Sequence, residues 1–155
     1  MTDLSDMIAL DCVLPDVSVG TKRALFTALG AASASALGLD AGLVATRLAD
    51  REKLGTTGFG GGIAVPHARI EGLPEVRGIF ARLTRGIDFA AVDDLPVDLV
   101  FMLLSPPDAG ADHLKALARV SRRLRDRGLA EKLRGAGSRD ALYALLTGIG
   151  ARDAA

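Results

Sequence analysis

The chain of 155 residues has little of several things that would mark its class. It contains no tryptophan, one tyrosine, five phenylalanines and one cysteine, Cys12. A single cysteine excludes an internal disulfide and suits a reducing cytosol. Net charge is also missing, since 19 basic residues balance 19 acidic ones. No overall field therefore draws the protein to nucleic acid or to a membrane surface, and any anion site must be local.

Long hydrophobic runs are absent as well. The most apolar segment, residues 97–104, contains Asp98 and is far too short to span a bilayer, which takes about 20 residues. The first residues, MTDLSD, are acidic and lack the basic and then apolar pattern of a signal peptide. We therefore expect a cytoplasmic protein without membrane insertion, of a length that fits one domain, residues 1–155.

The most distinctive segment that is present covers residues 51–70, REKLGTTGFGGGIAVPHARI. Four of its glycines fall within five positions, at Gly58, Gly60, Gly61 and Gly62. Such a loop is costly to order, so it indicates backbone that approaches a neighbour closely or adopts positive φ. The apolar run 63–65 predicts a short buried strand that ends at Pro66, because proline cannot donate to a sheet ladder. His67 is then expected at a strand end, held rigidly and open to solvent.

Hydrophobic periodicity predicts strands and helices in the rest of the chain. Strands are expected at an edge within residues 7–14 and at residues 76–84 and 97–104, the last of them buried on both faces. Helices are expected at residues 21–39, 40–54, 111–127, about 129–133 and 138–147. This order predicts an α/β fold, a mixed β-sheet flanked by helices on both faces.

Caps and inner faces follow from the same patterns. Ser18, Asp40 and Ser138 are expected to cap the first, second and last helices, and Gly55 is expected to end the second in the left-handed conformation. The helix at residues 111–127 is expected to face the core with Leu114, Leu117, Ala118, Ser121 and Leu124.

The chain has only two histidines, His67 and His113, and each follows the C-terminal end of an expected strand. If these strands are parallel neighbours, both imidazoles lie at one sheet edge, where open α/β folds place their sites. The alternative treats His67 as a hydrogen-bonded strand-end residue and His113 as a solvated residue of a first helical turn. The glycine loop favours a site, although no nucleotide phosphate-loop motif is present.

The chemistry that suits these residues is phosphoryl transfer. A neutral imidazole near its usual pKa of about 6.5 is a nucleophile that can accept a phosphoryl group. The added charge needs an arginine fork, a second imidazole and backbone N–H groups. Arg51, beside the glycine loop, and His113, near a helix start, fit these roles. Such a transfer requires no metal, and we expect no cofactor.

The run REKLGTTGFGGGIAVPHARIEGL resembles the phosphorylation-site signature of phosphotransferase-system enzyme IIA domains of the fructose/mannitol type. HLKALARVSRRL, which begins at His113, resembles the second histidine segment of that family. The similarity extends in order over residues 8–147, the expected core of a single enzyme IIA domain. It implies the family's mixed sheet with flanking helices.

By position, the resemblance implies that His67 is the phospho-accepting histidine, His113 the second active-site histidine, and Arg51 the arginine that supports the phosphoryl group. Loop residues are expected to bind the phosphoryl group as well: Thr56, Thr57, Gly58, Gly60 and Gly62. The chain departs from the family at Gly61, where relatives often have asparagine, and at Ala68, where many have glycine. We expect both departures to be tolerated.

The resemblance also implies a phosphocarrier that is charged by an HPr-like protein, itself charged from phosphoenolpyruvate. A free-standing chain with an extended arm before its first helix looks most like the nitrogen-regulatory enzyme IIA. That implies a regulator whose phosphorylation state sets which proteins it binds, with sensor kinases or transporters as possible targets. The alternative within the family is a sugar-specific enzyme IIA that relays phosphate to a IIB domain.

Other classes stay open. His67 and His113 could bind zinc with Asp108 or Asp112, although the chain has no H-E-x-x-H motif. A Ser/His hydrolase would need a G-x-S-x-G motif, which is also absent. A nucleic-acid surface would use the cations of the third helix, although such a run is more often a solvated face. These cations are Lys115, Arg119, Arg122, Arg123, Arg125 and Arg127.

A further alternative is a binding module in which phosphorylation only switches surface charge, without onward transfer. Either a relay or a switch needs an apolar rim around His67 for its partners. The expected rim residues are Phe59, Ile70 and Leu73.

Overall fold

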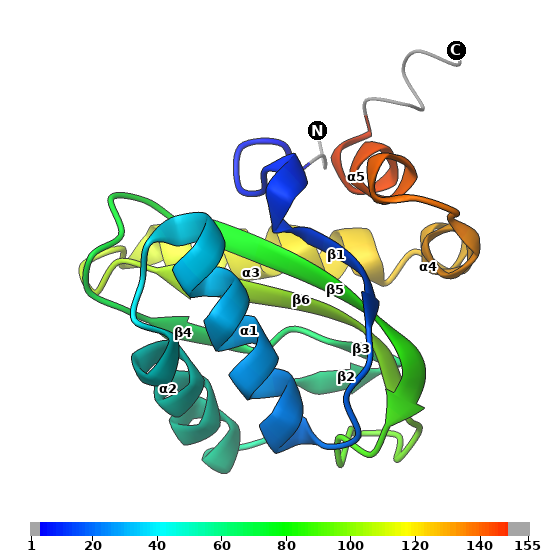
Figure 1. Ribbon diagram of the computed structural model, residues 1–155, viewed down its shortest axis with the longest axis horizontal. Helices are drawn as coiled ribbons and strands as arrows, with labels where there is room; N and C mark the ends of the chain where they lie inside the picture. Colours follow the sequence, from blue (N-terminus) through cyan, green and yellow to red (C-terminus); the bar gives the residue numbers. More distant parts are fainter. Residues whose placement is uncertain (1–3, 149–155) are drawn as a thin grey trace.

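The computed structural model describes residues 4–148 and contains a six-stranded mixed β-sheet with helices on both faces (Figure 1). The strands are β1 (Val13–Val17), β2 (Gly58–Gly60), β3 (Ile63–Ala64), β4 (His67–Arg69), β5 (Arg77–Ile87) and β6 (Val97–Ser105). The helices are α1 (Lys22–Leu37), α2 (Ala41–Lys53), α3 (Ala111–Leu124), α4 (Arg127–Gly135) and α5 (Arg139–Thr147), with a short 3₁₀ turn at Leu10–Cys12. The predicted fold class is confirmed.

Strand β6 lies at the centre of the sheet, whose order is β1-β5-β6-β3-β2, with β4 also paired to β6. All of β6 is buried except Asp98, as its apolar run predicts. It pairs antiparallel with β5 and parallel with both β3 and β4. Strand β1 pairs parallel with β5 at the sheet edge, so the expected edge strand is present but begins at Val13.

Two helical layers enclose the sheet. Helices α1 and α2 lie together in front of it in Figure 1, and α3 lies behind it. The α1–α2 contact is close, because a Cβ atom at Gly30 would collide with the carbonyl oxygen of Ala41. Apolar residues from both layers and from the sheet form one buried cluster.

The helix caps follow the prediction at two of three places. Asp40 caps α2 by accepting from Leu43 N at 2.9 Å, and Ser138 caps α5 by accepting from Ala141 N at 3.1 Å. The cap of α1 is Thr21 rather than Ser18, since Thr21 stands three residues before the free N–H of Ala24. The expectation for Gly55 is also wrong, because α2 ends on the right-handed Leu54 and Gly55 has a φ of 154°.

The predicted inner face of α3 is right at Leu124, which is buried, and at Leu117, which packs against the core, but it is wrong at Leu114. The buried positions are His113, Ala116, Val120 and Leu124, whereas Leu114 is 66% exposed. The prediction took the apolar Leu114 as inward and the polar His113 as outward. The side chain of His113 instead finds a hydrogen-bond partner inside, and this rotates the helix by one position. The helix also ends at Leu124, and α4 begins at Arg127, earlier than expected.

The glycine segment forms a β-hairpin. Strands β2 and β3 pair antiparallel across a turn at Gly61 and Gly62. The φ values of Gly60, Gly61 and Gly62 are 110°, 71° and 81°, so the expectation of positive φ is confirmed. The strand predicted over residues 63–65 ends at Ala64. The chain does not leave the sheet after Pro66, because the proline carbonyl accepts from Leu103 N at 2.9 Å and β4 continues along β6.

Candidate active site around His67

His67 begins β4, and its ring is fixed by two hydrogen bonds. Nδ1 lies 2.9 Å from the carbonyl oxygen of Val65. A carbonyl oxygen can only accept, so Nδ1 carries the ring proton and Nε2 carries the lone pair. The Arg51 guanidinium then donates from Nε to Nε2 of His67 at 3.2 Å. The local backbone therefore selects the tautomer in which Nε2 is the nucleophilic atom.

Arg51 lies in the last turn of α2 and is held in place by the chain that follows the helix. Its Nη1 donates to the carbonyl oxygen of Gly55 at 2.9 Å. Gly55 follows the C-cap residue Leu54, so this bond ties the guanidinium to the connection after the helix, while its Nε points to His67 on β4. The remaining N–H groups are available for phosphoryl oxygens.

His113 reaches the same place from the other layer. It lies in the first turn of α3 and is only 6% exposed, and its Nδ1 lies 2.6 Å from Oγ of Ser105 at the end of β6. The centroids of the His67 and His113 rings are 5.5 Å apart. The two histidines meet because β4 and β6 are parallel neighbours, with His67 opposite Leu103. The sequence-based expectation of one shared sheet edge is confirmed.

Both imidazoles are held in the neutral form. Burial lowers the pKa of His67, and the Arg51 guanidinium lowers it further, against the opposing effect of the Val65 carbonyl. Burial lowers the pKa of His113 to about 4, with added repulsion from His67 and Arg69. Neutral His67 has a free electron pair at pH 7, which is the condition for nucleophilic attack.

The two histidines line a shallow cavity of about 380 Å³. Its lining residues are Arg47, Asp50, Arg51, Leu54, His67, Ala68, Arg69 and His113. Three guanidinium groups and one carboxylate line it, and Arg47 also pairs with Glu71 at 3.4 Å, so the local charge is positive although the chain as a whole is neutral. An arriving phosphoryl group would be met by charge-assisted donors from α2 and from β4.

Three residues of this site were not predicted from the sequence. Arg47 stands one helical turn before Arg51, and Arg69 stands two residues after His67 on the same side of β4, so spacing alone could have indicated both. Ser105 carried no such signal. Ser105 takes part in the site only because the side chain of His113 is buried next to it.

The threonines Thr56 and Thr57 lie near the site but do not line the cavity. Thr57 donates from Oγ1 to Glu52 at 2.7 Å, and its backbone N–H also bonds that carboxylate. Thr56 accepts the N–H of Gly58 at 3.1 Å. Thr56 also donates from Oγ1 to the carbonyl oxygen of Phe89 at 3.5 Å, so both hydroxyl donors are engaged within the chain.

The glycines lie away from the histidines. The carbonyl oxygen of Gly62 accepts from Asp98 N and Leu99 N at the start of β6, whereas His67 pairs with Leu103 near its end. Five strand residues separate the two places, a distance of about 15 Å. Gly60 and Gly61 line a different cavity, and Gly58 packs against Phe89 and Ala91. The structure therefore does not bring Gly58, Gly60 or Gly62 to His67, and the loop serves the hairpin.

The expected apolar rim is also corrected. Ile70 is fully buried and Leu73 is nearly so, and Phe59 lies under the guanidinium of Arg125 in the cavity beside Gly60. Two exposed apolar residues stand on the elements of the site: Leu54, which lines the cavity, and Leu114, which follows His113 along α3.

Two features of residues 4–148 bear on the alternative functions. No three His, Cys, Asp or Glu side chains in this part of the chain are grouped so that they could hold a metal ion. None of its helices is long and apolar enough to cross a membrane.

Comparison with known proteins places this geometry in a class. The family model described as "Phosphoenolpyruvate-dependent sugar phosphotransferase system, EIIA 2" matches residues 6–148. The chain therefore belongs to this family of enzyme IIA proteins, as its two histidine segments indicate.

The relatives narrow the class further. A nitrogen regulatory protein of Bradyrhizobium diazoefficiens is 46% identical over 143 residues, which cover 92% of this chain and 94% of the relative. The fructose-specific EIIA component of Haloferax volcanii is 36% identical over 94% of this chain and 96% of its own length. The crystal structure of the nitrogen regulatory protein IIA-Ntr from Neisseria meningitidis superposes with a TM-score of 0.86, at 34% identity, covering 92% of this chain and 97% of that one. The nitrogen-regulatory branch of the family is therefore better supported than the sugar-specific branch.

Proposed function

We propose that this chain is a phosphocarrier of a nitrogen-regulatory phosphotransferase system. It takes a phosphoryl group on Nε2 of His67 from an HPr-like protein and regulates partner proteins according to its phosphorylation state. The observation that carries the proposal is the unprotonated Nε2 atom of His67. It accepts a hydrogen bond from Arg51 at 3.2 Å and lies at a cavity lined by arginines. The nitrogen-regulatory relatives support the choice of branch. A single domain in the cytoplasm, as expected from the sequence, is part of the proposal.

The transfer itself follows from the hydrogen bonds. The lone pair of Nε2 attacks the phosphorus of the donor's phosphohistidine, the donor's P–N bond breaks, and its electron pair returns to the donor's imidazole. The Nδ1 proton stays on His67, where the Val65 carbonyl stabilises the positive charge of the substituted ring. Arg51 turns from Nε2 to the phosphoryl oxygens as the new bond forms.

His113 supports the phosphoryl group in this proposal. The hydroxyl of Ser105 can donate to Nδ1 of His113, which leaves the proton of the neutral ring on Nε2. That N–H serves as a further donor toward the phosphoryl oxygens, together with the guanidinium of Arg69.

The second candidate function is the sugar-specific relay, in which phosphate moves on to a IIB domain. It is favoured by the fructose-specific relative at 36% identity, against 46% for the nitrogen-regulatory one. The site chemistry is the same in both cases, so the two functions differ only in the protein that approaches phosphorylated His67.

Intact-mass spectrometry at mildly alkaline pH tests the proposal. The protein is incubated with phosphoenolpyruvate, the general phosphotransferase enzyme and an HPr-like carrier from the cognate organism. We expect a single phosphoryl mass gain that is lost on acidification and is absent from His67→Ala. His113→Gln serves as the matched control and should still accept the group.

Two further readings complete the test. Nuclear magnetic resonance of the ¹⁵N-labelled imidazole should place the phosphorus on Nε2, and a bond to Nδ1 would contradict the tautomer argument. When a cognate IIB domain is added, the phosphoryl group should stay on this chain, whereas its rapid transfer to the IIB domain would favour the sugar relay. No mass gain in the native protein would reject the phosphocarrier function.

A further inference from the structure

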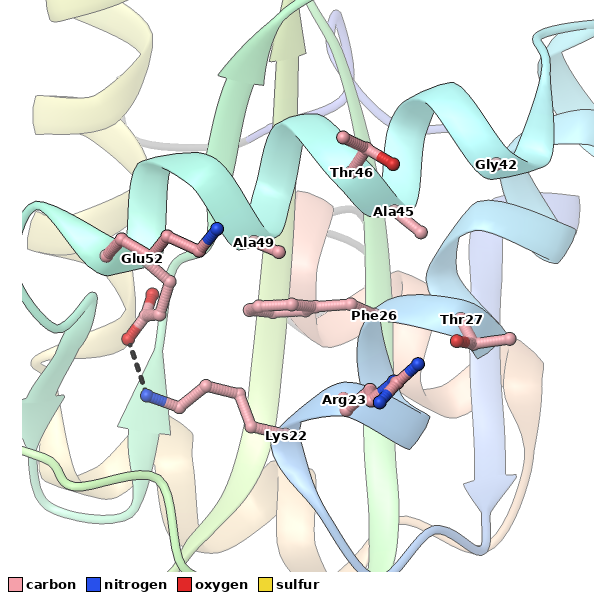
Figure 2. Close-up of a pocket in the computed structure, with 10 residues that line it drawn as sticks. Lys22, Arg23, Phe26, Thr27, Gly42, Ala45, Thr46, Ala49 and Glu52 are labelled. Atoms are coloured by element: carbon pink, nitrogen blue, oxygen red, sulfur yellow. Dashed lines mark hydrogen bonds and ion pairs between the residues drawn. The ribbon is translucent and has the colours of Figure 1, made fainter.

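A second cavity lies away from the histidine pair, between α1 and α2. Its volume is about 800 Å³, within the range of sites that hold small organic ligands. The ring of Phe26 lies flat between the two helices, below Ala45 and Ala49 of α2 (Figure 2). The lining runs along α2 from Gly42 to Lys53, a length of about 16 Å.

The floor of this groove is preformed. Phe26 is buried and packs edge to face on Phe89, with 6.3 Å between the ring centroids. Its ring is thus fixed in place, and because only 4% of Phe26 is exposed, it forms the floor of the groove with little free surface of its own. A ligand with an apolar body would mainly bury the half-buried side chains of Ala45 and Ala49 on α2, at little cost in protein rearrangement.

The mouth of the groove carries positive charge. Lys22, Arg23 and Lys53 line it together with the carboxylate of Glu52, and Lys53 also pairs with Asp50 at 3.7 Å. Arg23 is exposed, and within residues 4–148 its guanidinium makes no hydrogen bond or ion pair. The carboxylate is already engaged, because Glu52 bonds Lys22 at 2.9 Å and Thr57 at 2.7 Å. The unpaired guanidinium therefore sets the charge that a ligand would meet.

From this arrangement we infer that the α1–α2 groove binds a small organic anion with an apolar body, and that its occupancy is coupled to the state of His67. The apolar body lies on Phe26 between the helices, and the carboxylate, sulfonate or phosphate group pairs with Arg23 and Lys22. The proposed coupling rests on the proposed function of His67, whereas the proposed binding in the groove does not.

A chain of hydrogen bonds joins the groove to the nucleophile. Lys22 pairs with Glu52 in the groove, and Glu52 bonds Thr57, as described above. The carbonyl oxygen of Thr57 accepts from Val65 N at 3.0 Å, and the carbonyl oxygen of Val65 holds Nδ1 of His67 at 2.9 Å. Glu52 also follows Arg51 directly on α2, so one helical turn carries a residue of each site.

The sign of the coupling follows from charge. An anion in the groove draws Lys22 toward itself, which weakens the neutralisation of the Glu52 carboxylate. That carboxylate raises the pKa of His67, so its influence should grow when the groove is occupied. The other charged or titratable groups that face His67 keep their places: Arg47, Asp50, Arg51, Arg69 and His113. By reciprocity, a change in the charge at His67 changes the affinity of the groove.

The binding test uses two fluorescent probes that share one apolar body. 1-Anilinonaphthalene-8-sulfonate carries a sulfonate, and N-phenyl-1-naphthylamine does not. We expect saturable binding of one sulfonate probe per chain, with about tenfold weaker binding of the uncharged probe, since one charge-assisted pair is lost. Arg23→Gln should lower the affinity for the sulfonate probe to that for the uncharged probe. Arg122→Gln on α3 is the matched control and should leave both affinities unchanged.

A second variant keeps the test independent of charge. Ala49→Phe fills the groove above Phe26 and should abolish binding of both probes, with folding checked by amide resonances. Absence of saturable binding to the native protein would overturn the inference. Binding that survives both Arg23→Gln and Ala49→Phe would overturn it as well, because the probe would then lie elsewhere.

The coupling is measured on unphosphorylated protein by imidazole resonances. Saturation with the sulfonate probe should raise the pKa of His67 by about half a unit, close to a threefold change in proton affinity. Lys22→Met should cause a similar rise without any probe, and Lys53→Met should not. An unchanged His67 titration would reject the coupling. Binding persists in this design even if His67 is never phosphorylated, so failures of the two proposals can be told apart.

Discussion

At the scale of single residues, the two histidines differ in what holds their Nδ1 atoms. In His67 the partner is a backbone carbonyl, which accepts only and so leaves Nε2 as a nucleophile. In His113 the partner is the Ser105 hydroxyl, which can donate and so allows Nε2–H to act as a donor. The same side chain thus takes two roles, each set by one hydrogen bond.

Arg51 is predicted to stabilise the phosphorylated state. Arg51→Ala removes the fork that meets the phosphoryl oxygens, a loss of roughly 1.5–3 kcal/mol, or roughly 10- to 100-fold in the phosphorylation equilibrium. The measurement is the phosphorylated fraction at a fixed ratio of phosphoenolpyruvate to pyruvate. Arg51→Lys keeps the positive charge but loses the forked pair of donors, so its phosphorylated fraction should lie between those of wild type and Arg51→Ala. A fraction equal to wild type in Arg51→Ala would contradict this role.

At the scale of elements, the β2–β3 hairpin explains the glycines. Gly61 donates to Asp93 at 2.9 Å, and its carbonyl oxygen accepts from Arg134, which also pairs with Asp98. The glycines allow the positive φ values of this turn, and the charged side chains then hold it to the start of β6. The hairpin in turn sets the register of β3, and hence the position of His67 further along the chain.

A matched pair of substitutions tests this role. A Cβ atom at Gly62 would meet Arg134 and Asp98 at positive φ, whereas a Cβ atom at Gly61 would meet nothing within 4 Å. We expect Gly62→Ala to lower the free energy of unfolding by about 1–3 kcal/mol, and Gly61→Asn to change it little, because asparagine tolerates left-handed backbone. Urea unfolding gives both values. Equal losses in the two variants would contradict the argument.

We predict that the exposed apolar residues at the helix ends beside the site, Leu54 and Leu114, form a border that contacts the phosphoryl donor. Leu54 is 84% exposed after α2, and Leu114 is 66% exposed on α3. Leu54→Asp and Leu114→Asp should each raise the donor concentration needed for half-maximal phosphorylation about tenfold, while stability is kept. Leu95→Asp, at the far end of β6, is the control. A donor dependence that is unchanged in both site variants would remove this border from the interface.

At the scale of the whole molecule, stability should depend on pH through the histidine pair. Burial lowers the pKa of His113 to about 4 in the folded chain, against about 6.5 when unfolded. The unfolded state therefore binds more protons between these values, and the stabilisation present above pH 6.5 is lost as the pH falls toward 4. The lowered pKa of His67 acts in the same direction.

The comparison of wild type with His113→Gln isolates this effect. Glutamine keeps a polar partner for Ser105 but does not titrate. Between pH 7 and pH 4.5, the loss of unfolding free energy should be smaller in the variant by roughly 2–3 kcal/mol. Urea unfolding at the two pH values measures it. Parallel losses in the two proteins would contradict the lowered pKa.

The sequence by itself determined the fold class, the central strand β6 and two of three helix caps, and it pointed to His67, His113 and Arg51, which the structure brings together. These features depend on local patterns: an eight-residue run that is apolar except for Asp98, side chains that satisfy free N–H groups, and the spacing around His67. The family membership rests on the same two histidine segments.

Only the tertiary structure decided which groups meet. Parallel pairing of β4 with β6 joins His67 to His113 across 46 positions of sequence, and the buried Ser105 turns α3 so that His113 faces inward. The same pairing carries the glycine turn about 15 Å from the site that its sequence neighbourhood suggested. Pairing and burial depend on residues distant in the chain, and periodicity within one segment does not contain that information.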